Sequence, residues 1–114
     1  MEEMVPVGTG EPMSRTNGPE RVLRAPESLG LDSRADFRAR AVTLLEEMPE
    51  GEGRLVVDLA PTNRIDSAGL GALMLVQRRA AERRQRVALR RPSDEVRFLL
   101  TLTKLLDLFE LDAA

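Results

Sequence analysis

The run Leu55–Leu59, LVVDL, constrains the fold of this chain more than any other feature of its sequence. It is nearly continuous in apolar residues and too short for a helix, which is typical of a strand buried on both faces of a parallel sheet. A helix is expected over 68–84, after the loop APTNR and residues 65–67. Before it, apolar residues recur at helical spacing and predict another amphipathic helix: Phe37, Ala41, Leu44, Leu45 and Met48.

Strand and helix patterns alternate along the rest of the chain. Strands are expected at 21–24, 55–59 and 86–90, and a further edge strand is a candidate at 4–7, where Pro6 lacks a donor. Strands separated by helices predict an α/β fold: a small, mixed, mostly parallel sheet of about four strands. The helices should lie largely on one face, because there is little apolar material to cover two.

Two serines mark expected helix starts. Ser33, followed three residues later by Asp36, resembles a short capping box, and Ser93 precedes two acidic residues of a first helical turn. The later run KLLDLFEL, residues 104–111, is predicted to form a second short helix. The first half of the helix at 68–84 is apolar nearly all round, so we expect it to be deeply packed.

The composition excludes several classes of function. The 114 residues suit one domain, which we place at 21–114 after a flexible tail at 1–20 rich in proline and glycine. Without Cys or His, the chain lacks thiolate chemistry, the commonest general base and the commonest metal ligand. We expect no cofactor and no metal. The net charge of −2 argues against a nucleic-acid partner.

The N-terminal residues and the lack of a long apolar run lead us to expect a soluble cytoplasmic protein. The acidic N-terminus does not resemble a signal peptide, and no apolar run is long enough to insert into a membrane.

Seven arginines lie between Gln77 and Arg91, with Glu82 as the single acid. We interpret this cluster as a solvated helix end and strand edge, with a secondary contact to an acidic partner as the alternative.

The stretch NRIDSAGLGAL, residues 63–73, joins the buried strand to the following helix. Ser67 lies at the junction, where free backbone N–H groups and the positive end of the helix dipole meet. Either Ser67 or Asp66 can serve as the N-cap. Gly69 and Gly71 each cost about 1 kcal/mol relative to Ala inside a helix. We therefore expect another backbone, a ligand or a partner to approach the helix closely there.

The residues around Ser67 exclude the common serine chemistries. The nucleophile elbow of hydrolases needs glycine two positions before the serine, where this chain has Ile65, and no histidine is present to act as base. An exposed serine at a helix start can instead be a phosphorylation target. A phosphate adds about −1.5 to −2 charges, which beside Asp66 would repel a docked partner without unfolding the domain.

From about Arg21 to Leu111 the chain resembles the STAS domain of bacterial anti-sigma factor antagonists. The most specific match is a strand ending in V-D-L, the six-residue spacer APTNRI, and then D-S-x-G-L-G. The later PSDEVRFLLTLTKLLDLFEL also resembles the ending of the family. The resemblance implies a small, mostly parallel sheet with helices largely on one face, in agreement with the order of elements above.

The resemblance also implies a function and partners. In the family, the serine of D-S-x-G is phosphorylated by an anti-sigma factor that is itself a serine kinase with a histidine-kinase-like ATPase fold. The unphosphorylated antagonist binds this kinase and frees the sigma factor, and a PP2C-type phosphatase reverses the modification. By position, Ser67 is the phosphate acceptor. The docking patch would comprise Asp66, Ala68, Gly69, Leu70, Asn63 and Arg64, with Asp32 and Ser33 beside it.

The chain departs from the family at one position, and the resemblance leaves other roles open. The family commonly has G-E-L-D after its second strand, with the aspartate near the phosphoserine, whereas that position here is Gly30 in ESLGLDS. Asp32 is the candidate replacement.

STAS domains also serve as subunits of lipid-transporting ABC systems and as components of stress-signalling complexes. A weak homodimer is a further alternative.

Overall fold

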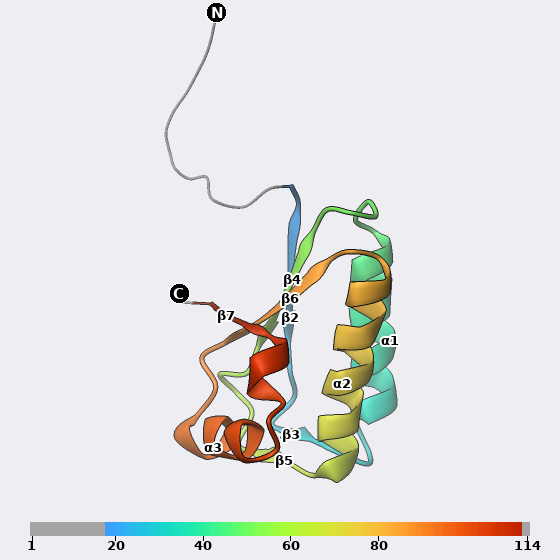
Figure 1. Cartoon of the computed structure of the whole chain (residues 1–114). Coiled ribbons are helices and arrows are strands. Elements are labelled where there is room, and N and C mark those ends of the chain that lie inside the picture. Colours follow the sequence, from blue (N-terminus) through green and yellow to red (C-terminus); the bar gives the residue numbers. More distant parts are fainter. Residues whose placement is uncertain (1–17, 113–114) are drawn as a thin grey trace, which may run out of the picture.

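The computed structural model describes residues 18–112 (Figure 1). The candidate strand at 4–7 and most of the predicted tail at 1–20 lie outside these residues. The observed order follows the predicted alternation of strands and helices. The elements are β2 (Glu20–Arg24), β3 (Ser28–Leu29), α1 (Arg34–Glu46), β4 (Arg54–Asp58), β5 (Arg64–Ile65), α2 (Ser67–Glu82), β6 (Arg86–Arg90), α3 (Asp94–Leu102), the 3-10 helix η1 (Leu106–Leu108) and β7 (Glu110–Asp112).

Four parallel strands form the main sheet, in the order β2-β4-β6-β7. Leu23 of β2 lies opposite Val57 of β4, Val57 lies opposite Leu89 of β6, and Leu89 lies opposite Leu111 of β7. Each strand is added on the same side of the one before it, so right-handed crossovers place the connecting helices on the same face. The predicted sheet of about four strands, with helices largely on one face, is confirmed.

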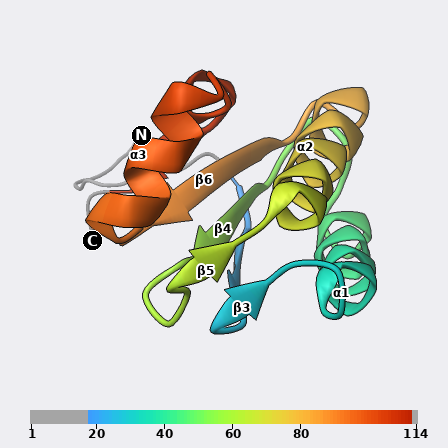
Figure 2. The same cartoon turned by 90° about the horizontal axis from the view of Figure 1, so that it is seen from below.

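One hydrophobic core fills the space between this sheet and the helices. Alternate residues of the central strands point into it, among them Leu55, Val57 and Leu89, and all three are fully buried. Burying each such side chain contributes about 1.5–3 kcal/mol. Figure 2 shows α1 and α2 lying side by side over the sheet. The helices contribute Phe37, Ala41, Leu45, Ala72, Leu73, Val76, Val96 and Leu100 to the core.

The opposite face of the sheet carries a network of charged side chains centred on Arg54 of β4. The Arg54 guanidinium donates to Glu20 of β2 at 2.6 Å, and to Glu110 and Asp112 of β7 at 3.0 and 3.2 Å. Burial alone would lower the pKa of Arg54, but these hydrogen bonds raise the pKa above its ordinary value. The network therefore ties both outer strands to the centre of the sheet.

The prediction of a second helix at 104–111 is wrong except for one short turn. Residues Leu106–Leu108 form one turn of 3-10 helix, after which the chain extends into β7. Phe109 is buried, and Leu111 pairs with β6. The strand forms because it completes the ladder of β6 and brings two carboxylates to Arg54, which its local sequence does not reveal. Within residues 18–112, no helix is both long and apolar enough to cross a membrane.

Candidate functional site

The loop before α2 is fastened to the rest of the domain by a small second sheet. In it, β3 and β5 form a two-residue parallel pair near the start of α2 (Figure 2). The buried Thr62 donates its hydroxyl to the carbonyl oxygen of Pro26 at 2.7 Å, and the N–H of Asn63 donates to Glu27 at 2.9 Å. These bonds fix the direction in which the chain enters α2. The role of Thr62 is not predictable from its sequence neighbours.

Asp66, and not Ser67, is the N-cap of α2. One oxygen of its carboxylate accepts from the N–H of Gly69 at 2.9 Å, and the other accepts from the N–H of Leu31 at 3.2 Å. These two hydrogen bonds, assisted by the charge of Arg34, lower the pKa of the Asp66 carboxyl below its ordinary value. Asp66 is therefore ionised at neutral pH. The structure thus decides between the two caps that the sequence left open.

Ser67 is the first residue of α2, and its side chain is exposed. Among the residues that the structure describes, none forms a hydrogen bond with its hydroxyl group. Because Asp66 supplies the cap, this hydroxyl has no structural task at the helix start. Asp66 also cannot act as a strong base toward it, because its oxygens already accept backbone N–H groups. The hydroxyl is therefore an accessible group for another protein to modify, and it is not activated as a nucleophile.

The two glycines of α2 have different reasons to be there. A Cβ atom at Gly69 would lie 2.0 Å from the carbonyl oxygen of Leu29, so the backbone of β3 is what approaches the helix. A Cβ atom at Gly71 would meet nothing within 4 Å. The predicted close approach is thus confirmed for Gly69 as packing against a neighbouring strand. Gly71 lies on an open surface.

The loop between β3 and α1 differs from its prediction. Ser33 occupies the N-cap position of α1, but its hydroxyl donates to the carbonyl of Ser28 at 2.7 Å and accepts from the N–H of Gly30 at 3.1 Å. The predicted capping box is therefore wrong, and Asp36 pairs with Arg40 at 2.9 Å instead. Ser33 has backbone dihedrals in the helical region, and its hydroxyl is engaged by the backbone of the turn at 28–33 in place of the helix amides.

Gly30 cannot be replaced by a residue with a side chain without displacing Asp66. A Cβ atom at Gly30 would lie 2.4 Å from a carboxylate oxygen of Asp66. The Asp66 carboxylate thus lies directly against the position where the family carries its aspartate. Asp32 is exposed two residues further on. Its role as a replacement stays a prediction.

The residues of the predicted docking patch come together around the start of α2, at different depths. Asn63, Arg64 and Asp66 are exposed, as is Ser67. Ala68 and Leu70 are half-buried, and Gly69 is buried beneath them. Asp32 and the half-buried Ser33 belong to the adjoining loop. A partner could therefore contact most of the patch directly, while Gly69 acts by letting the helix approach β3.

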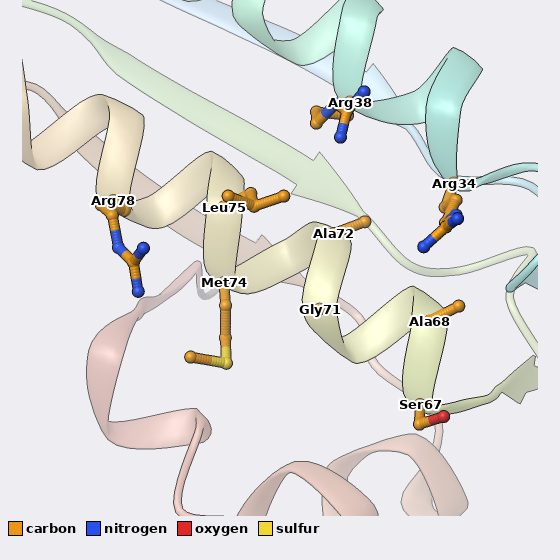
Figure 3. A pocket seen from close by; sticks show the side chains of 9 residues that line it. All are labelled: Arg34, Arg38, Ser67, Ala68, Gly71, Ala72, Met74, Leu75 and Arg78. Carbon is orange, nitrogen blue, oxygen red and sulfur yellow. The ribbon is translucent and has the colours of Figure 1, made fainter.

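A groove between α1 and α2 adjoins Ser67, and the sequence did not predict it (Figure 3). It has a volume of about 350 Å³. Met74 and Leu75 lie on its α2 side and are 38% and 42% exposed, so the prediction of deep packing all round this helix is wrong for these two residues. Arg34 and Arg38 line it from α1. These two arginines are four residues apart, so they share one face of α1. That spacing is the sequence signal that could have indicated a charged wall of the groove.

The predicted arginine cluster at 78–91 is mostly engaged within the domain. Arg86 pairs with Glu110 at 3.2 Å, Arg90 with Asp112, and Arg91 with Asp58 at 2.7 Å. Arg83 donates to the backbone carbonyl of Met48 at 2.8 Å. Burial by itself would raise the pKa of Asp58, but its bonds to Arg91 and to the Ala60 N–H lower it. The cluster therefore serves chiefly the fold, and Arg78 is the member that lines the groove.

The fold and the site define a compact α/β domain with an exposed, unactivated serine at the start of its central helix. In the described part of the chain, no group of three His, Cys, Asp or Glu residues could hold a metal ion. The sequence matches the family model described as Mlab, STAS domain, over residues 13–110. The chain therefore belongs to the STAS domain family. Among curated proteins, none matches the sequence significantly.

Solved structures share this fold at low sequence identity. TM1081, a putative anti-sigma factor antagonist from Thermotoga maritima, has a TM-score of 0.64 and 22% identity, over 79% of this chain and 77% of that one. The anti-sigma factor antagonist SpoIIAA in its unphosphorylated form has a TM-score of 0.67 and 20% identity, over 82% and 81%. A sulfate transporter family protein from Wolinella succinogenes has a TM-score of 0.66 and 18% identity, over 82% and 75%.

Proposed function

We propose that this STAS domain is an anti-sigma factor antagonist, a binding module and not an enzyme, whose affinity for its partner is switched at Ser67. Unphosphorylated, it binds an anti-sigma serine kinase with a histidine-kinase-like ATPase fold in the cytoplasm. Phosphorylation of Ser67 releases it, and a PP2C-type phosphatase restores the binding form. The family membership and the antagonist neighbours support this general kind of function.

The observation that carries the proposal is the separation of roles between Asp66 and Ser67. Asp66 caps α2, which leaves the Ser67 hydroxyl exposed and unpaired within residues 18–112. A kinase can therefore transfer the γ-phosphoryl group of ATP to this oxygen, with loss of the hydroxyl proton and release of ADP, while the helix keeps its cap. The modification changes the surface and leaves the fold intact.

The electrostatics of the patch explain why the phosphorylated form should be released. The Asp66 carboxylate is already ionised, and the phosphate would add about −1.5 to −2 charges beside it. Like charges brought together in a protein interface cost several kcal/mol. A partner surface that fits the unmodified patch, including Asn63 and Arg64, would therefore lose its affinity.

The proposal is tested by binding measurements with the partner kinase, identified as a serine kinase encoded near this gene. Ser67→Asp should weaken the complex by at least about tenfold, which corresponds to ~1.4 kcal/mol. Ser67→Ala should bind as the wild type does. Thr43→Asp is the matched control, because Thr43 is exposed on α1 outside the groove. If Ser67→Asp bound the kinase as tightly as Thr43→Asp, the switch would be refuted.

A second candidate is a STAS subunit of a lipid-transporting ABC system that braces the ATPase. The fold is also shared by a sulfate transporter family protein, so it is not confined to anti-sigma factor antagonists. In that role the start of α2 would be a static interface, and Ser67 would not be modified. Affinity capture that recovers an ABC ATPase and no sigma-regulating kinase would favour it. Membership of a stress-signalling complex would instead appear as a large assembly in size-exclusion chromatography.

A further inference from the structure

The groove between α1 and α2 ends beside Ser67 and carries positive charge that forms no ion pair within residues 18–112. Arg34 and Arg38 line it from α1, and Ser67, Leu75 and Arg78 line it from α2. Figure 3 shows the two α1 arginines across the groove from Ala68 and Ala72, with Ser67 at its lower end. In the described range, none of the three arginines has a carboxylate within ion-pair distance. By contrast, Arg40 on the same helix is paired with Asp36.

The Asp66 side chain takes up amide donors at the start of α2 that could otherwise stabilise a phosphate on Ser67. The N–H of Gly69 donates to the Asp66 side chain at 2.9 Å, and the N–H of Leu70 donates to the Asp66 carbonyl at 3.0 Å. The carboxylate that holds the Gly69 donor remains ionised. A phosphate beside it has fewer amide donors available and gains a negative neighbour. A nearby cation would supply the counter-charge that the helix start does not.

We propose that Arg34 and Arg38 of α1 receive the phosphate of phosphorylated Ser67 across the groove, so that the modified side chain closes its lower end. The inference rests on the proposed phosphorylation of Ser67. Arginine presents planar, paired donors that suit a phosphate, and the two arginines are one helical turn apart on the same face. Arg34 is close enough to the site for its charge to act on Asp66.

This arrangement adds a second effect to the repulsion described above. In the unmodified domain the groove offers Arg34 and Arg38, neither paired with a carboxylate of the described residues, next to exposed apolar surface at Met74 and Leu75. In the phosphorylated domain those cations are neutralised from within the chain. An acidic group of the partner that used them would be displaced by the phosphate of the same molecule. Release therefore combines a new negative charge with the loss of a positive site.

The test measures the second pKa of the phosphate directly and needs no kinase. Phosphoserine is incorporated at position 67 during translation, and the full chain is titrated by ³¹P NMR at low salt. An opposite charge within about 4–6 Å lowers a pKa by roughly 1–3 units, and solvent exposure reduces this. Arg34→Gln should therefore raise the phosphate pKa by about 0.5–1 unit, and Arg38→Gln should raise it by a smaller amount.

Arg78→Gln is the matched control for charge and groove position. Arg78 lines the same groove but lies eleven residues along α2 from Ser67, about 16 Å at the helical rise. Its substitution should leave the phosphate pKa nearly unchanged. If Arg34→Gln and Arg38→Gln both moved the pKa no more than Arg78→Gln does, the inference would be overturned. Since the kinase is absent from this experiment, that outcome would leave the binding switch to be judged by its own measurement.

Discussion

Replacing Gly69 with Ala should destabilise the domain, whereas the same change at Gly71 should stabilise it. Both glycines lie in the first turns of α2, so both gain up to about 1 kcal/mol of helix propensity from the change. At Gly71 the new methyl group meets nothing within 4 Å, and the gain remains. At Gly69 it would lie 2.0 Å from the Leu29 carbonyl oxygen and 2.8 Å from the carbonyl carbon.

The size of the destabilisation follows from how far the Gly69 methyl group and the Leu29 carbonyl must move apart. Ordinary contact begins at 3.4 Å, so β3 or α2 must move by more than 1 Å. That movement would break the hydrogen bond from the Asp66 N–H to the Leu29 carbonyl, now 3.3 Å long. Overpacking of this kind costs about 1–3 kcal/mol, and an unyielding backbone places Gly69→Ala at the upper end. The two variants should therefore differ by about 3 kcal/mol.

Urea denaturation of both variants and the wild type measures this difference, and thermal unfolding provides a second estimate. A domain of this size shifts its Tm by about 4–8 °C per kcal/mol, so the two Tm values should differ by more than about 10 °C. Equal stability of the two variants would refute the reasoning. It would mean that the β3 backbone does not constrain the start of α2.

Two further predictions concern the caps of the helices. Ser93→Ala should lower the free energy of unfolding by about 1 kcal/mol in urea denaturation, because the Ser93 hydroxyl accepts from the Val96 N–H at 3.1 Å. Ser67→Ala should lower it by almost nothing. Equal losses in the two variants would contradict the assignment of Asp66 as the cap. Because Asp66 has a lower pKa folded than unfolded, its contribution to stability is present above the ordinary value of 3.8 and is lost as the pH falls through the folded pKa. In Asp66→Asn, stability should therefore fall less between pH 7 and pH 3 than it does in the wild type, measured as the difference between the denaturation midpoints at the two pH values. The same difference in both proteins would argue against the lowered pKa of Asp66.

The predictable part of the fold came from patterns that are local in sequence. The apolar run at 55–59 and the helical spacing around Phe37 identify their elements without knowledge of distant residues. In contrast, β7 has helical spacing in its own segment. Its extended form depends on Glu110 and Asp112 meeting Arg54, which lies 56 and 58 residues earlier. Local pattern therefore could not distinguish this strand from a helix.

The position of the site was predictable from local sequence, but the roles of its two central residues were not. The sequence located the junction at Asp66 and Ser67, but both residue types are preferred caps. The choice is decided by the N–H of Leu31, 35 residues away, which donates to the second oxygen of Asp66. The groove was missed for a related reason, since Arg34 becomes a neighbour of Ser67 only after α1 packs against α2.

Mapping the phosphorylated residue by tandem mass spectrometry, after incubation with the partner kinase and ATP, tests the central claim most directly. The account predicts one phosphoryl group on Ser67, none in Ser67→Ala, and loss of the kinase complex as the modification proceeds. A chain that stays unmodified while bound, or one that is modified at Ser28 or Ser93 instead, would contradict it.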